Sequence, residues 1–351
     1  MYCKVMKAVA ASALVAGLGW AGTASADSIS PETFSATLAA GESVTINKTV
    51  TVSQALTTGQ VDIFFLADTT GSMGSAINSV RNAAASLLAT TSTYGSVQWA
   101  VGEYRDVGDA FVYRLNQQFT STQSAVTTGI NQWTASGGGD IPEANLYGLE
   151  QAAGANWREG STKILVWFGD APGHDPRLGV SEVSATQALV DAGIKVQAIN
   201  TLGANQGIDA GGQAGRIAAA TDGNLFNGVN QAAVAAAIAD AIETAVSSYS
   251  SVCLDASEAP AGVSVTTSAC YTGAFDREIE REFDFTITFT AESPGTYAFN
   301  TYGTVDGGRV ATEADRIVVL GDGPGTPVPL PGTLLLLGAG LAALGVRRRA
   351  A

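Results

Sequence analysis

The sequence predicts an α/β protein whose doubly wound, mainly parallel sheet is inserted in, or flanked by, a small β-sandwich. Between residues 59 and 249, apolar strand-like runs alternate with Ala-rich helical stretches, the pattern of a parallel sheet covered on both faces. On either side, residues 27–58 and 250–321 show the alternation of apolar and polar residues that is typical of half-buried strands. These two observations define the expected architecture.

The central region contributes the parallel sheet. We expect strands at 61–67, 97–104, 111–119, 163–168 and 194–199, and helices at 76–88, 123–133, 143–153, 182–191, 213–220 and 232–246. Trp133, Trp157 and Trp167 are interpreted as core residues. Open sheets of this kind bind ligands at the edge where their strands end, so residues that follow the strands are the candidates for a functional site.

Neither flank has enough strands to close a core alone. Apolar residues alternate with polar ones in both: Val44, Ile46, Val50 and Val52 in the first, and Phe283, Phe285, Ile287 and Phe289 in the second. We therefore expect residues 27–58 and 250–321 to pair into one β-sandwich around an α/β domain at 59–249. The alternative is an N-terminal arm that packs on the α/β sheet.

Both ends of the chain have the composition of targeting segments. Lys4 and Lys7 precede an apolar run that ends on Ala24-Ser25-Ala26, which predicts a signal peptide over 1–26. A Pro- and Gly-rich linker at 322–329 leads into an apolar run followed by three arginines at 347–349, which predicts a transmembrane tail over 330–351. The sequence leaves open whether this tail is cleaved or retained.

The tail resembles the PEP-CTERM sorting signal of Gram-negative bacteria, which combines a Pro-x-Pro motif, an apolar helix and terminal arginines. Val328-Pro329-Leu330-Pro331 has Leu where that family usually has Glu. The resemblance implies an exosortase-type processing enzyme as a partner. The protein is then expected in the cell envelope or outside the cell, tethered to the membrane by its tail unless the tail is cut. A plain C-terminal anchor is the alternative.

Charge and cysteine content limit the partners and the redox compartment. The formal net charge is −14, and without the five basic residues of the two ends 13 basic residues face 32 acidic ones, which gives −19. Such a surface repels nucleic acid, so no nucleic-acid partner is expected. Cys253 and Cys270 remain after removal of the signal peptide, and in an exported chain this pair predicts a disulfide.

Oxygen-bearing side chains follow two of the predicted strands and open one predicted helix. Asp68-Thr69-Thr70-Gly71-Ser72 ends the first strand, and its spacing lets the first, third and fifth side chains point the same way. Asp170 follows the strand at 163–168, and a Gly-rich loop leads into Asp140-Ile141-Pro142-Glu143. Hard oxygen donors of this kind suit Mg²⁺. Taken singly, each motif is also compatible with a turn or a helix N-cap.

Together these motifs resemble the metal-ion-dependent adhesion site of von Willebrand factor A domains, written Asp-x-Ser-x-Ser. The Asp-x-Pro-Glu version is similar to the integrin β I-like domain. The resemblance implies a Rossmann-like fold and a metal held by five residues: Asp68, Thr70, Ser72, Glu143 and Asp170. Mg²⁺ is the expected cofactor, and whether Ca²⁺ or Mn²⁺ takes its place stays open. Thr70 departs from the family's Ser but keeps the hydroxyl.

The integrin-like resemblance also implies a second metal, with these candidate ligands: Asp106, Asp140, Glu143 and the carbonyl of Pro142. For Asp106, pairing with Arg105 or with solvent is the alternative. No third metal is predicted, because Ser75 and Ala76 stand where that family has acidic residues.

The sequence therefore predicts an exported adhesion or interaction protein. Its metal would bind an acidic or other oxygen-donor group of a protein or polysaccharide ligand. The alternative is a structural protein of an exopolysaccharide matrix, in which the metal only stabilises the fold. No enzymatic activity is expected, because neither Ser72 nor His174, the only histidine, lies in the context of an activated nucleophile. His174 is interpreted as a rim or loop residue.

Overall fold

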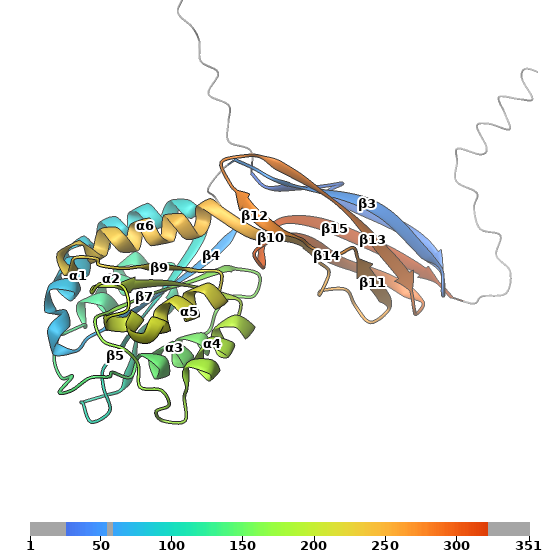
Figure 1. The fold of residues 1–351 in the computed structure, drawn as a ribbon. Helices are drawn as coiled ribbons and strands as arrows, with labels where there is room; N and C mark the ends of the chain where they lie inside the picture. The colour runs from blue at the N-terminus through green and yellow to red at the C-terminus, as the bar shows by residue number, and fades with distance from the viewer. Residues whose placement is uncertain (1–25, 55–58, 322–351) are drawn as a thin grey trace, which may run out of the picture.

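The computed structural model describes residues 26–54 and 59–321. Figure 1 shows an α/β unit beside an elongated β-sandwich. The predicted linker and transmembrane tail at 322–351 lie outside the described residues, and so does the predicted signal peptide except for Ala26. Within the described part of the chain, no helix combines the length and the apolar character that a membrane crossing requires.

The sheet of the α/β unit is 6-stranded, in the order β6-β5-β4-β7-β8-β9. Its strands are β4 Gln60–Asp68, β5 Ser96–Tyr104, β6 Tyr113–Thr120, β7 Thr162–Gly169, β8 Ile194–Asn200 and β9 Asn224–Phe226. Neighbouring strands are parallel, except that the edge strand β6 runs antiparallel to β5. Every residue of β4 after Gln60 is buried, as expected for a central parallel strand covered on both faces.

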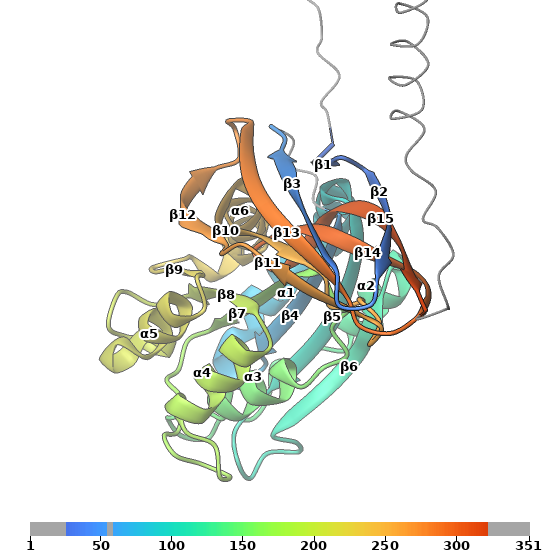
Figure 2. The ribbon, with the colours of Figure 1, turned by 90° about the vertical axis from the view of Figure 1, so that its right-hand side faces the viewer.

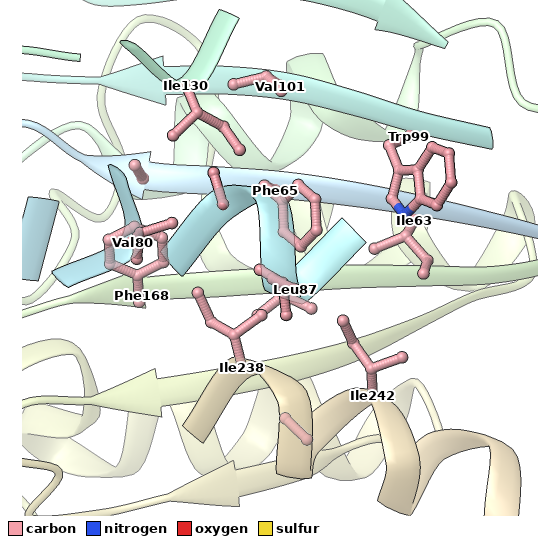
Figure 3. Close-up of a cluster of buried hydrophobic side chains, with 14 of the residues drawn as sticks. Ile63, Phe65, Val80, Leu87, Trp99, Val101, Ile130, Phe168, Ile238 and Ile242 are labelled. Atoms are coloured by element: carbon pink, nitrogen blue, oxygen red, sulfur yellow. The ribbon is translucent and has the colours of Figure 1, made fainter. Parts of the chain in front are cut away.

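Helices cover both faces of this sheet. One face packs against α1 Gly74–Thr91, α2 Gln123–Asn131 and α6 Val234–Ser247, and the other against α3 Asn145–Ala153, α4 Glu182–Asp191 and α5 Gln213–Ala220. In the first layer, Phe65 of β4 lies close to Leu87 of α1 and to Ile238 of α6 (Figure 3). Short 3-10 helices complete the unit: η1 Gly71–Met73, η2 Ser92–Tyr94, η3 Gly207–Gly212 and η4 Gln231–Ala233. The predicted doubly wound α/β fold is confirmed.

The sandwich has a 4-stranded sheet, β1-β3-β13-β11, and a 5-stranded sheet, β12-β10-β14-β15-β2. The strands are β1 Ser28–Ser30, β2 Thr33–Ala39, β3 Ser43–Val52, β10 Ser248–Asp255, β11 Val263–Thr267, β12 Tyr271–Asp276, β13 Arg281–Ala291, β14 Gly295–Val305 and β15 Gly308–Leu320. β3 pairs with β13, and β2 pairs with β15, so each sheet contains strands from both flanks. The N-terminal segment is thus part of the sandwich and not an arm on the α/β sheet (Figures 1 and 2).

The two units are joined tightly. α6 ends at Ser247 and β10 begins at the next residue. In the turn between β14 and β15, Asp306 pairs with Lys195 of β8 and accepts the backbone N–H groups of Ser250 and Ser251. Further along β10, Cys253 and Cys270 form the predicted disulfide, with their Cα atoms 4.5 Å apart.

Candidate metal centre

The candidate centre lies where the strand order of the sheet changes direction. β4 leads to α1 on one face of the sheet, whereas the neighbouring strand β7 leads to α4 on the other face. The loops that leave the two strands therefore diverge, which opens a crevice at their carboxyl ends. Asp68 is the last residue of β4 and Asp170 directly follows β7, so the topology places both carboxyl groups at this crevice.

The first motif is folded around the Asp68 carboxyl group. Asp68 Oδ1 accepts the backbone N–H of Thr70 at 2.9 Å and its hydroxyl at 2.7 Å. Thr70 Oγ1 lies 3.5 Å from Ser72 Oγ, and the Ser72 hydroxyl donates to Asp170 Oδ1 at 3.0 Å. A continuous chain of polar contacts thus joins four of the five predicted ligands.

Glu143 completes the set from the loop that crosses the edge of the sheet between α2 and α3. The helix predicted at 143–153 begins only at Asn145, because Glu143 is held in extended conformation by a hydrogen bond from its N–H to the Pro172 carbonyl at 2.8 Å and a bridge to Gly173. A Cβ atom at Gly138 would lie 2.7 Å from both Glu143 Oε1 and Thr70 Cβ. Gly138 therefore lies directly against both candidate ligands.

The carboxyl groups of this centre are crowded and poorly compensated. Asp68 Oδ2 and Glu143 Oε2 are buried and have no hydrogen-bond partner among the described residues. Burial, and to a smaller extent repulsion among the carboxylates including Asp170, raises the pKa of Asp68 to about 7 and that of Glu143 to about 8. The pKa of Asp170 is also raised, chiefly by burial. Among the described residues, no positive side chain pairs with these carboxyl groups.

This donor set fits a hard divalent cation. Three carboxyl and two hydroxyl groups are the ligand types that Mg²⁺ prefers, and the two orphaned oxygens are the atoms that a cation would satisfy. Within residues 26–54 and 59–321, no group of three or more His, Cys, Asp or Glu side chains forms a ready-made metal cage. Two of the five candidate ligands are hydroxyl groups. The fit to a cation is therefore judged from the carboxyl and hydroxyl groups together and from the two unpartnered carboxylate oxygens.

The residues predicted for a second metal are only partly brought together. Asp106 is 5 % exposed, and its Oδ1 lies 3.0 Å from His174 Nε2. Arg105 instead donates to the Thr134 carbonyl at 2.7 Å, so the expected alternative of pairing with Arg105 is wrong for Asp106. Asp140 is exposed and Pro142 is half-buried in the loop before Glu143.

Asp109 is a supporting residue that the sequence interpretation missed. Its Oδ2 accepts the backbone N–H of Asp106 at 3.1 Å and that of Gly138 at 2.9 Å. One carboxylate thereby fixes the Gly-rich loop against Thr70 and Glu143. The only signal in the sequence is an Asp three residues after Asp106, which by itself is typical of a turn.

Comparisons with known proteins agree with this fold. Residues 62–233 match the family model described as von Willebrand factor A domain, and residues 327–349 match the PEP-CTERM protein-sorting motif. No curated protein matches the chain. The PEP-CTERM match lies outside the described residues and rests on the sequence alone.

Several solved structures are similar. A von Willebrand factor type A protein from Catenulispora acidiphila is 15 % identical with a TM-score of 0.47, and the match covers 86 % of this chain and 76 % of that one. The pilus adhesin SpaC from Lactobacillus rhamnosus GG is 13 % identical with a TM-score of 0.43, over 79 % and 45 % of the two chains. For proximal thread matrix protein 1 from the mussel byssus the values are 15 %, 0.42, 67 % and 51 %. The chain thus spans about half the length of the last two.

The two family matches indicate the class of protein and the compartment to which it is exported. A PEP-CTERM motif implies export to the cell envelope and processing by an exosortase-type enzyme. A von Willebrand A domain in an exported chain indicates a protein of the adhesion type. The chain contains a von Willebrand factor A domain over residues 62–233 and carries a PEP-CTERM protein-sorting motif over residues 327–349.

Proposed function

We propose that this protein is an adhesion or interaction module of the cell envelope that binds its partner through a divalent cation, with Mg²⁺ as the expected ion. The ligands would be the five residues of the crevice: Asp68, Thr70, Ser72, Glu143 and Asp170. The observation that carries the proposal is the pair of buried, unpartnered carboxylate oxygens, Asp68 Oδ2 and Glu143 Oε2. Buried oxygens of this kind are costly unless a positive charge satisfies them.

The chain's own residues prepare the site. Asp68, through its two hydrogen bonds from Thr70, fixes the hydroxyl that faces Ser72. Asp109 holds the Gly-rich loop so that Glu143 reaches the crevice. When bound, the cation supplies a position for an oxygen of the partner, such as a carboxylate of a protein or an acidic polysaccharide. We propose no catalytic role, since His174 lies against Asp106 and not against Ser72.

The loops around the crevice expose apolar side chains, which supports a binding face. Ile141, two residues before Glu143, is 69 % exposed, and Leu202 in the loop after β8 is 42 % exposed. Leu178, in the loop that follows Asp170, is 49 % exposed. Exposed apolar side chains on loops beside a binding site are typical of surfaces that contact a partner.

Two measurements test the proposal. Thermal unfolding with Mg²⁺ and with a chelator reports cation binding, and about 3 kcal/mol of stabilisation is expected when Mg²⁺ is at 100 times its Kd. Adsorption to immobilised poly-L-glutamate and to a polyuronic acid then reports the acidic-ligand step.

We expect both signals to depend on Mg²⁺ and to be lost in Asp68→Asn. The matched control is Asp191→Asn, which removes one exposed carboxylate at the far end of α4. Mg²⁺-dependent stability without Mg²⁺-dependent adsorption to either polymer would instead support the structural matrix alternative. If Mg²⁺ changes neither signal, the cation site itself is refuted.

A further inference from the structure

Three ionisable side chains lie together in the core of the β-sandwich, outside the candidate metal centre. Lys48 of β3 and Glu313 of β15 are both 0 % exposed, and Asp315 of β15 is 2 % exposed. Lys48 Nζ is in direct contact with Glu313 Oε1. Figure 2 shows β3 and β15, which belong to different sheets. The contact between Lys48 and Glu313 therefore crosses the interior of the sandwich.

The strand pattern shows why these side chains point inward. In β3, Lys48 has the same phase as the buried Val50 and Val52, and in β15 the two acids have the same phase as the buried Ile317 and Val319. A strand points alternate side chains to one face, so all three charged residues occupy core positions.

Aromatic rings enclose the cluster. Asp315 stands opposite Phe34 on one neighbouring strand and Phe299 on the other. The Phe34 ring lies 5.7 Å from Lys48 Nζ and stacks on Phe289 at 5.3 Å between ring centroids. Bulk water is therefore kept away from the amine and from both carboxyl groups.

An ordinary ion pair leaves this cluster incompletely satisfied. Two carboxyl groups face one amine, and Glu313 Oε2 and Asp315 Oδ1 are buried without a partner among the described residues. Burying charges costs several kcal/mol per ion, and only good mutual pairing offsets this cost. Desolvation lowers the pKa of Lys48 to about 8 and raises that of Asp315, which favours an uncharged amine beside an uncharged acid. Thr301 holds Asp315 by donating to its Oδ2 at 2.7 Å.

We propose that Lys48 and Glu313 condense to an amide, an intramolecular isopeptide bond that joins β3 to β15. The lone pair of the uncharged Lys48 Nζ attacks Cδ of the protonated Glu313 carboxyl group, and a C–N bond forms. The C–OH bond of Glu313 breaks, and its oxygen leaves as water with one proton from the carboxyl group and one from the amine.

Asp315 lies two residues from Glu313 on the same buried face of β15 and interacts electrostatically with Lys48, and in the proposed step it would act as the proton carrier. It gives its proton to the departing hydroxyl and regains one from the amine, so it ends as it began and no external reactant is needed. Direct contact of the two groups and exclusion of water are the conditions under which such a condensation is favoured.

The bond would close the sandwich around the inserted unit. Lys48 and Glu313 are 265 positions apart, and the whole α/β unit lies between them in sequence. β15 is also the last described strand before the sorting motif. A covalent link at this place would keep the first and last parts of the sandwich together when the chain is pulled by a bound partner at one end and its attachment at the other.

Mass spectrometry of the full exported chain, after reduction of the disulfide, tests the proposal directly. The wild type and Lys48→Met are processed at the same ends, so their mass difference is independent of processing. We expect Lys48→Met to be heavier than the wild type by about 18 Da, one water molecule, beyond the change that the substitution itself makes. The wild-type tryptic digest should contain residues 310–316 linked to a peptide that includes Lys48, with no cleavage after Lys48.

Asp315→Asn provides a second variant that removes the proton carrier but retains a side chain of the same shape. It should fold and show a smaller or slower mass loss, and Asp315→Glu should restore part of it. A folded wild type that has its full sequence mass and releases residues 310–316 as a free peptide would overturn the proposal. Because the wild type alone gives this result, the test holds even if Lys48→Met fails to fold.

Discussion

Replacing Asp68 by Asn should stabilise the metal-free protein while abolishing its response to Mg²⁺. Burial raises the pKa of this carboxyl group from 3.8 to about 7. A group whose pKa is raised in the folded state contributes stability that is fully present below its unfolded pKa and is lost as the pH rises through its folded pKa. At pH 8 the ionised Asp68 therefore costs the metal-free fold about 4 kcal/mol.

Asn removes this charge and retains an oxygen that accepts both hydrogen bonds from Thr70. Its amide NH₂ would take the place of Oδ2, which has no partner, and an unsatisfied buried donor costs about 1–3 kcal/mol. The net gain in a chelator at pH 8 is therefore about 1–3 kcal/mol. Since a domain of this size gains about 2–4 °C per kcal/mol, its Tm should rise by several degrees.

Tryptophan fluorescence is a suitable assay for this unfolding step. Trp99, Trp133, Trp157 and Trp167 all belong to the α/β unit, and Trp20 falls in the predicted signal peptide, so the signal reports on that unit and not on the sandwich. Melting curves of the wild type and of Asp68→Asn at pH 8, in a chelator and in Mg²⁺, give the difference in Tm without the ion and the increase in Tm that Mg²⁺ causes.

Asp62→Asn is a matched control in the same strand. Asp62 is also 0 % exposed, but it is paired with Arg158 at 2.7 Å and accepts the Ser161 hydroxyl. Its substitution should destabilise the protein with and without Mg²⁺, because Arg158 loses its charge partner. If Asp68→Asn destabilises the chelated protein as Asp62→Asn does, or if it still responds to Mg²⁺, the reasoning about the centre is wrong.

Two further predictions concern the same crevice. Mg²⁺ affinity should fall as the pH decreases from 8 to 6, because Asp68 and Glu143, with pKa values of about 7 and 8, must release protons to bind the ion. Calorimetry in two buffers of different ionisation enthalpy would measure the number of protons released. If no protons are released on binding, the prediction is wrong. Gly138→Ala should weaken Mg²⁺ binding at least about tenfold and lower the free energy of unfolding by about 1–2 kcal/mol, because its φ is +68° and a Cβ would press on Glu143 and Thr70. Gly139 has no atom within 4 Å of an added Cβ, so Gly139→Ala should bind Mg²⁺ like the wild type in the same titration.

The sequence was sufficient to predict the fold and the proximity of two candidate ligands. Parallel strands end at the same edge of a sheet, so Asp68 and Asp170 had to lie near one another once β4 and β7 were recognised as neighbours. Glu143 was different. Its place depends on a loop that crosses the sheet edge and on its bond to Pro172, and no local periodicity encodes such a contact. Only the family resemblance indicated it.

The surroundings of Asp106 show where local reasoning fails. Arg105 was the obvious partner by sequence, but adjacent residues in a loop need not point toward one another. Arg105 reaches Thr134, and Asp106 meets His174, which comes from a distant loop. The spacing of residues along a loop does not determine which of them meet, so a second metal at Asp106 and Asp140 stays a prediction.

The Lys48 cluster could have been found from the sequence. Val44, Ile46, Val50 and Val52 alternate with polar residues in the sequence, and Lys48 occupies the same phase between them. A charged residue at an inward position of an otherwise apolar strand predicts either a buried partner or a chemical function. What the sequence could not provide was the identity of that partner, because β15 lies at the other end of the chain.

The buried carboxyl groups of this protein differ in whether neighbouring side chains satisfy their charge and hydrogen bonds, and the groups that stay unsatisfied mark the two proposed sites. Asp62 has Arg158 and Ser161 to satisfy it, so its burial is a matter of structure alone. Asp68 and Glu313 each keep one buried oxygen that no described residue satisfies. At Asp68 the neighbours are hydroxyls and further carboxyls, which attract a cation. At Glu313 the neighbour is an amine in direct contact, which can form a bond. An unpartnered buried carboxyl oxygen can therefore indicate a cation site or a covalent bond, and the adjacent side chain determines which of the two is expected.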